Sequence, residues 1–183
     1  MVACSWSGTT RHWWSGRRRP SSSTWTSSPW RSAARTACSA QRLLVVDRAL
    51  LAKQVATVRD AVTRIRAVLP ASREAFEADR TAREVVVLNL FVAIQVCLDL
   101  AAHWLADEGW DVPQRYGEIF VALADHGVIP RPLALRLVAA AGLRNLVAHQ
   151  YGTLEWARLY ATASSPDLDD LEAFCAALAA KAR

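Results

Sequence analysis

The sequence predicts an all-α protein, an up-and-down bundle of helices, and three observations support this fold class. Apolar residues recur at spacings of three and four along residues 47–183, the period of a helix that buries one face. The strict alternation of apolar and polar residues that is typical of a strand is missing from this part of the sequence. Prolines and glycines divide the helical pattern into segments with short connections, as in a bundle of antiparallel neighbours.

The first 46 residues differ in composition from the rest. They carry seven arginines and no Asp, Glu or Lys, so residues 47–183 hold the other 15 basic residues and all 17 acidic ones, a net charge of −2. The net charge of +5 for the whole chain therefore comes from this leader. It is no evidence that the helical part binds nucleic acid through its overall charge.

Three interpretations of residues 1–46 remain open. Arginines interleaved with tryptophans can bind single-stranded nucleic acid, and a polar stretch without periodicity is typical of a disordered tail. Trp, Arg, Ser, Thr, Ala and Pro without acids is also what GC-rich DNA gives in a wrong reading frame, and we favour this hypothesis, with the true start near Val45 or Val46. We therefore expect a disordered or mis-annotated extension over residues 1–46 and one helical domain over residues 47–183.

The first two helices of the domain are long. One is predicted over residues 47–69, where Pro70 ends it. Ser72 is a suitable N-cap for the second, which runs through Ala102 and ends before Gly109.

The apolar stretch Val85–Ala102 is the only candidate for a membrane span. It contains Asn89, Gln95 and Asp99, each of which is costly in hydrocarbon. We therefore expect this stretch to lie inside the bundle and the protein to have no membrane contact.

Four further helices are expected. Gly127 closes the first, Pro132 stands in the first turn of the second, and Gly152 breaks that helix. A serine cap followed by Pro166 at the first helical position begins the last one. These helices cover residues 114–127, 128–151, 154–163 and 164–181.

The stretch "LRNLVAHQYG", Leu143 to Gly152, concentrates polar side chains at the end of an apolar helix. At about 100° per residue one face carries the polar side chains and the opposite arc carries the packing residues Leu143, Leu146 and Val147. The polar set is Arg144, Asn145, His149 and Tyr151.

Arg144 and His149 are suited to cutting RNA without a metal ion. An imidazole can move a proton to or from a ribose hydroxyl or a leaving oxygen, and a guanidinium can hold a phosphate and stabilise its developing charge. The structural alternative is that Arg144 and Asn145 cap neighbouring carbonyls and that His149 is an ordinary surface residue. Spacing alone favours this alternative, because the pattern Arg-x4-His is common by chance.

The segment "RNLVAHQY" resembles the Arg-x4-His-x-Tyr motif of HepT-like toxins, which are HEPN-domain ribonucleases. The likeness extends to "DRTAREVVVLNLFVAIQVCLDLAAHWLADEG", to "YGEIFVALADHGVIP" and to "LVAAAGLRNLVAHQYGTLEW". It covers about Asp47 to Ala180, whereas residues 1–46 depart from the family entirely.

The resemblance implies a HEPN-type homodimer in which the motifs of both subunits face a shared cleft. It implies a metal-independent RNA endonuclease without cofactor, in which Arg144 and His149 are catalytic. Asn145 stands four residues before His149, and from this spacing we expect it to position the imidazole or the substrate. The resemblance further implies a type VII-like toxin–antitoxin pair, whose MntA-type nucleotidyltransferase antitoxin silences the toxin by AMPylation of Tyr151. Without the family, Tyr151 is an ordinary amphipathic residue that closes a helix.

A polar stripe on the long helix is a second candidate, formed by Glu84, Gln95, Asp99 and His103. Asp99 or Glu84 could orient Arg144, and His103 could line the RNA cleft. The alternative is a buried polar network between helices or across the dimer interface, which we favour for Glu84. Asp99 is kept as a supporting residue of the site.

Arg80 and Arg83 are candidate contacts for RNA phosphates, although arginines at such positions usually form a solvated face. The acidic balance of residues 47–183 argues against strong unspecific RNA binding, so a local patch built by two subunits would be needed.

Other kinds of site are not indicated. The four cysteines lack CxxC spacing and the four histidines lack metal-ligand spacing, so we expect no metal and no disulfide framework, as in a reducing cytoplasm. No P-loop or dinucleotide-binding glycine pattern occurs.

Two rival functions remain open. One is a HEPN module that binds nucleotide or RNA for its nucleotidyltransferase partner and does not cleave. The other is a structural helical dimer that sequesters its partner.

Overall fold

The computed structural model describes residues 48–182. This part of the chain contains seven α-helices, one short 3-10 turn and no β-strand, which confirms the predicted all-α class. The interpretations of residues 1–46 fall outside the described residues.

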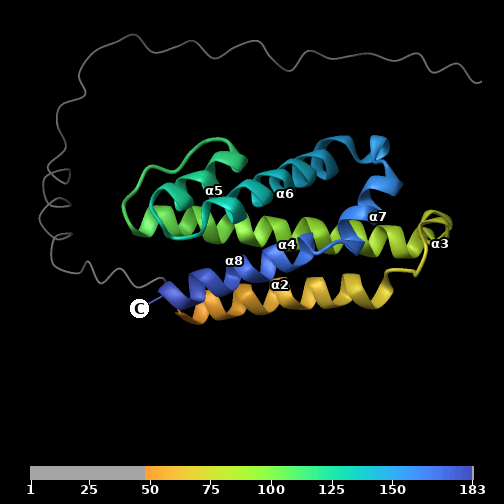
Figure 1. Cartoon of the computed structure of the whole chain (residues 1–183), viewed down its shortest axis with the longest axis horizontal. Coiled ribbons are helices and arrows are strands. Elements are labelled where there is room, and N and C mark those ends of the chain that lie inside the picture. Colours follow the sequence, from red (N-terminus) through yellow and green to blue (C-terminus); the bar gives the residue numbers. More distant parts are fainter. Residues whose placement is uncertain (1–47, 183) are drawn as a thin grey trace, which may run out of the picture. The chain divides into compact units, whose positions relative to one another are not determined.

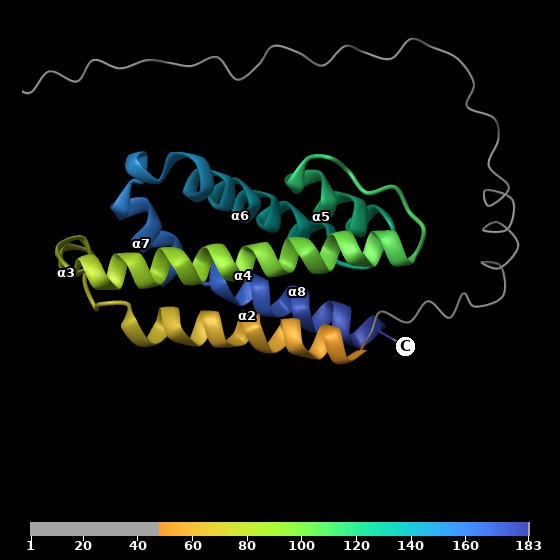
Figure 2. The same cartoon turned by 180° about the vertical axis from the view of Figure 1, so that it is seen from behind.

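Three helices form the centre of the bundle. They are α2 (Arg48–Val68), α4 (Arg80–Asp107) and α8 (Asp167–Lys181), and they run side by side in both views (Figures 1 and 2). Helix α4 packs most extensively against α2 and contributes more buried residues than any other described helix. It is therefore the core against which the other elements are placed.

The remaining helices cover the opposite side and one end of α4. Helices α5 (Tyr116–Asp125) and α6 (Arg131–Gln150) lie on the side of α4 away from α2, as Figure 1 shows. The short helices α3 (Arg73–Ala78) and α7 (Trp156–Ser164) pack together near the start of α4. The motif at the end of α6 therefore lies near the beginning of α4.

The predicted long helix that begins at Ser72 is broken at Asp79, so the prediction of one continuous helix was wrong. The Ser72 hydroxyl accepts a hydrogen bond from the Ala75 N–H at 3.2 Å, as predicted for an N-cap. After α3 the backbone of Asp79 is extended, and its carboxylate accepts from the Ala82 N–H at 3.0 Å to cap α4. An aspartate favours such a cap over a helix interior.

Three other helix ends test predictions. Gly109 and Gly127 adopt positive φ angles of 72° and 69°, as glycines that end a helix commonly do. Tyr151 is the C-cap of α6 with helical backbone angles, as predicted, and it also begins the 3-10 turn Tyr151–Thr153, which was not predicted.

The start of α8 is shifted by one residue from its prediction. The Ser165 hydroxyl accepts from the N–H of Asp167 at 3.2 Å, which confirms the serine cap. Pro166 precedes the helix and is not its first residue.

The core is one apolar cluster to which α4 contributes twelve buried residues. Phe120 and Phe174 meet edge to face with centroids 5.5 Å apart, and each fully buried side chain of this kind stabilises the fold by roughly 1.5–3 kcal/mol. Among the described helices α4 alone is long and apolar enough to cross a membrane, and half of its most apolar window is buried inside the bundle. Cys97 and Cys175 lie in the core as free thiols.

Candidate active site around the motif of α6

Arg144 is fixed by contacts that leave its charge available. Its Nε donates to Oε1 of Gln95 on α4 at 2.7 Å, and its Nη1 donates to Oδ1 of Asn145 at 3.1 Å. Both acceptors are neutral amides, and within residues 48–182 no carboxylate pairs with this guanidinium. The remaining N–H groups can therefore hold an anion.

Two aromatic rings complete the surroundings of Arg144. The guanidinium carbon lies 4.7 Å from the ring centre of Tyr116 and 5.2 Å from that of Phe91. Rings at these distances stabilise a cation by about 0.5–1 kcal/mol each at exposed sites without neutralising it. Arg144 is thus held by α4 and α5 together.

Asp99 acts on Arg144 only through Gln95. Its Oδ1 accepts from Nε2 of Gln95 at 2.8 Å, one helical turn along α4. This hydrogen bond fixes the amide with its oxygen toward Arg144. The predicted stripe therefore contains a relay from Asp99 through Gln95 to Arg144.

The other two members of the stripe lie outside this relay. Glu84 is exposed and forms an ion pair with Arg80, 2.7 Å between Nε and Oε1. His103 is exposed and lines a small hollow against α2 with Leu50 and Gln54, so it does not adjoin Arg144.

His149 is exposed in the last turn of α6. In the described part of the chain it forms no hydrogen bond or ion pair, so it is not bonded to Arg144, Asn145 or Tyr151. The amide of Asn145 accepts from Arg144 and is not bonded to the imidazole. The imidazole is thus accessible to a substrate.

Tyr151 leaves the α6 face and turns toward α7. Its ring meets that of Trp156 edge to face, with centroids 6.2 Å apart, and 46% of the residue is exposed. The guanidinium of Arg83 lies over the Trp156 ring at 4.7 Å. Tyr151 and Arg83 are therefore brought to the same tryptophan.

Arg80 belongs to the same neighbourhood. The pKa of Arg80 is raised mainly by its hydrogen bond and ion pair with Glu84, with a smaller contribution from the Tyr151 phenol. Apart from His103 and His149, the residues named from the sequence thus form two groups, one around Arg144 and one around Trp156.

Sequence reasoning did not identify three contact residues, Phe91, Tyr116 and Trp156, and it left Gln95 without a role. The four-residue spacing of Gln95 and Asp99 was a usable signal, since such neighbours on a helix bond to each other. Nothing in the sequence marked the aromatic contacts, because they join residues from different helices.

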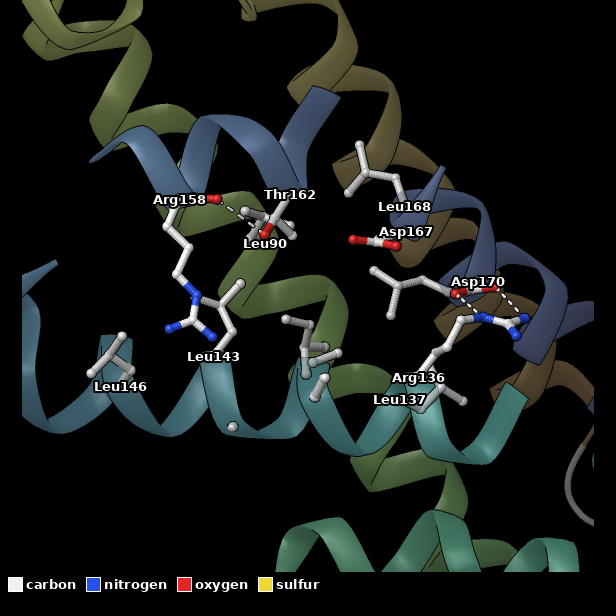
Figure 3. Close-up of a pocket in the computed structure, with 15 residues that line it drawn as sticks. Leu90, Arg136, Leu137, Leu143, Leu146, Arg158, Thr162, Asp167, Leu168 and Asp170 are labelled. Carbon is white, nitrogen blue, oxygen red and sulfur yellow. Dashed lines mark hydrogen bonds and ion pairs between the residues drawn. The ribbon is translucent and has the colours of Figure 1, made fainter. Parts of the chain in front are cut away.

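A hollow of about 660 Å³ lies behind the motif helix, between α4, α6, α7 and α8. Leucines from three of these helices line it, including Leu90, Leu143 and Leu168 (Figure 3). Figure 3 also shows Arg136 paired with Asp170, and Arg158 extending from α7 toward α6. Leu143 and Leu146 face this hollow, as expected for the packing arc opposite Arg144.

The family described as Ribonuclease HepT-like matches residues 58–178 of the chain. A curated relative, the mRNA nuclease HepT of Shewanella oneidensis, is 30% identical over 105 residues, which are 57% of this chain and 78% of the relative.

Solved structures agree with this match. A tri-AMPylated HEPN toxin of Shewanella oneidensis in complex with its MNT antitoxin is similar with a TM-score of 0.66 and 28% identity, over 72% of this chain and 97% of that one. A toxin–antitoxin complex with AMP-PNP gives a TM-score of 0.66 and 27% identity, over 72% and 98% of the two chains.

Proposed function

Because the chain belongs to the family of HepT-like ribonucleases, which have a HEPN domain, we propose that it is a cytoplasmic toxin that cleaves RNA without a metal ion. The observation that supports this most is the guanidinium of Arg144, which is held by Gln95 and two rings and has no carboxylate partner in the described residues. Such a cation is positioned for a phosphate and is not neutralised by the protein itself.

The two motif residues have complementary roles in this reaction. Arg144 holds the non-bridging oxygens of the scissile phosphate, while the imidazole of His149 takes the proton from a ribose 2′-hydroxyl. The 2′-oxygen then attacks phosphorus, the bond to the 5′-oxygen breaks, and the departing oxygen receives a proton from the imidazolium or from water. Arg80 and Arg83 add phosphate contacts farther along the RNA.

The toxin acts as a homodimer in this proposal, and α4 offers a face for the second copy. Leu88 is 61% exposed on α4, and the half-buried Val92 and Gln95 follow on the same side at about 100° per residue. In this proposal the second copy covers Leu88, which lies on the face of α4 that also carries Gln95, the partner of Arg144. Substitution of Leu88 by Arg should give a monomer in light scattering. The matched control is Leu135→Arg, because Leu135 is 56% exposed and lies on the face of α6 opposite Arg144, about 180° around the helix axis. This variant should remain a dimer.

The activity is tested by RNA cleavage with the purified full chain in excess EDTA. Cleavage should persist in the chelator and fall about a hundredfold or more in His149→Ala and Arg144→Ala. The matched control is His103→Ala, an exposed histidine that faces α2, and it should cleave at the wild-type rate. Cleavage that stops in EDTA and returns with a divalent metal would show that the mechanism is wrong.

An MNT-type nucleotidyltransferase antitoxin silences the toxin in this proposal by AMPylation of Tyr151. The phenol oxygen attacks the α-phosphorus of ATP, the bond to the β-phosphate oxygen breaks, pyrophosphate leaves, and the phenolic proton passes to a base or water. The exposed Tyr151 ring at the end of the motif helix supports this assignment.

The modification is tested by the intact mass of the chain after expression with its antitoxin. The wild type should gain one or more AMP units, and Tyr151→Phe should gain none while its RNA cleavage remains active. Tyr116→Phe, which also removes a partly exposed phenol, should still be modified. AMP found on Tyr116 or on another residue would refute the assignment.

The alternative of a non-cleaving binding module is supported by one observation. In the described part of the chain His149 has no partner that orients its imidazole. Intact RNA with wild-type protein that is shown by mass to carry no AMP would favour this module.

A further inference from the structure

Arg83 differs from its neighbour Arg80 because no carboxylate balances its charge. Arg80 pairs with Glu84, whereas Arg83 forms no ion pair within residues 48–182. Its guanidinium instead lies over the ring of Trp156 at 4.7 Å, and its Nε is buried without a hydrogen-bond partner there. A buried donor without a partner is costly, so the fold holds this arginine in place although its charge has no partner in residues 48–182 and remains free to attract an anion.

Trp156 links this cation to the proposed modification site. The same indole contacts Arg83 through its face and Tyr151 through an edge-to-face contact at 6.2 Å. Tyr151 is exposed, so a group attached to its oxygen has room, and Arg80 is close enough to interact with the phenol electrostatically. Any phosphate bound to the Tyr151 oxygen is thus tethered near two arginines.

We propose that Arg83, assisted by Arg80, holds the phosphodiester of AMP once Tyr151 is adenylylated, so that the attached nucleotide is fixed against the Arg83–Trp156 surface. This inference rests on the proposed AMPylation of Tyr151 and adds how the modification silences the toxin. The phosphodiester carries one negative charge, which matches the uncompensated guanidinium. Because the phosphate is tethered, its effective concentration at Arg83 is in the millimolar range or above.

The consequence is competition between the attached AMP and the substrate. Arg83 and Arg80 are the residues proposed to hold RNA phosphates outside the motif, and the tethered phosphate competes for them as long as AMP remains attached. The attached AMP therefore inhibits the toxin because it occupies the surface that would bind RNA. The loss of the free phenol is not the cause of inhibition.

The test compares wild type, Arg83→Gln and Arg83→Lys, each expressed as the full chain with the antitoxin and confirmed by mass to carry AMP. A nonspecific phosphodiesterase is then added, and the rate of AMP removal is followed by mass. AMP should leave Arg83→Gln about tenfold faster than wild type, the factor that a charge-assisted bond of roughly 1.4 kcal/mol supplies. Arg83→Lys keeps the charge but lacks the planar guanidinium, so its rate of AMP removal should lie between those of wild type and Arg83→Gln.

The second readout is the ratio of RNA cleavage by unmodified and modified protein, taken within each variant so that any loss of RNA affinity cancels. This ratio should be smaller in Arg83→Gln than in wild type. The matched control is Arg158→Gln, an arginine on the helix of Trp156 that faces the hollow behind α6, and both readouts should equal those of wild type.

The outcomes separate the two proposals. A wild-type chain that receives no AMP contradicts both. Modified Arg83→Gln with the removal rate and cleavage ratio of wild type overturns the role of Arg83 and leaves the AMPylation intact. If Arg83→Gln receives no AMP although Tyr151 of the wild type does, Arg83 serves recognition of the antitoxin, and the proposal is wrong.

Discussion

Nε of Arg144 donates to Oε1 of Gln95 at 2.7 Å, and this hydrogen bond joins the motif helix α6 to the core helix α4. The two residues are 49 positions apart in the sequence. Since Gln95 is in turn held by Asp99, the direction of the guanidinium depends on a helix that carries no part of the motif. The following four predictions start from contacts of this kind.

Substitution of Gln95 by Leu should lower RNA cleavage by about tenfold, because a hydrogen bond to a charged group contributes roughly 1.5–3 kcal/mol and Phe91 and Tyr116 still retain the guanidinium. The loss should appear in kcat at saturating RNA, since the phosphate is still attracted but is held at the wrong angle. Gln54→Leu, a half-buried glutamine on α2, is the matched control and should be unaffected. Equal effects of the two substitutions would indicate a general loss of stability.

Asp99 should tolerate Asn and not Leu. An asparagine keeps an oxygen that can accept from Nε2 of Gln95, so Asp99→Asn should cleave at nearly the wild-type rate. In Asp99→Leu the side-chain amide of Gln95 is free to turn and no longer holds its oxygen toward Arg144. Cleavage should then fall by roughly two- to tenfold, the effect of one neutral hydrogen bond. A large loss in Asp99→Asn would mean that the carboxylate charge itself takes part in the reaction.

Gly142→Ala should stabilise the protein by about 0.5–1 kcal/mol, because glycine is unfavourable in the middle of a helix. An added Cβ at Gly142 meets nothing within 4 Å, so no clash opposes the gain. Gly109→Ala is the matched control and should destabilise, since the φ angle of 72° there disfavours a side chain. Urea denaturation followed by circular dichroism measures both changes, and a lower midpoint for Gly142→Ala would contradict the prediction.

Cys97 should resist alkylation in the folded protein. Hydrogen bonding with Cys175 and burial raise the pKa of the Cys97 thiol, so the reactive thiolate is not formed at neutral pH. Native and urea-unfolded protein are treated with iodoacetamide at pH 7.5, and the peptide with Cys97 is quantified by mass spectrometry. Labelling should require unfolding; fast labelling of the native chain would show that the core around Cys97 opens locally.

The fold could be predicted largely from the periodicity of apolar residues, and the errors of this prediction have local causes. The apolar period identified the helices around Val58, Leu98 and Leu137 because each buries one stripe on the same core. The break at Asp79 was missed because its neighbours continue a helical pattern, and only the cap of Ala82 by the Asp79 carboxylate interrupts it.

The candidate site was predictable within each helix and not between helices. The spacing of Gln95 and Asp99 placed them on one stripe, but the choice of Gln95 as the partner of Arg144 depends on how α6 lies across α4. The contact between Tyr151 and Trp156 depends in the same way on the 3-10 turn Tyr151–Thr153, which the sequence did not predict.

The break at Asp79 also decides where the electric field of α4 is strongest. The peptide dipoles of this 28-residue helix add up to a partial positive charge at its first turn, which begins with Arg80 and holds no acidic residue. A helix that continued unbroken from Ser72 would have placed this positive pole seven residues earlier, about 10 Å away along the helix axis. Because α4 starts at Arg80, the pole lies in the same helical turn as Arg83 and favours a phosphate that binds there.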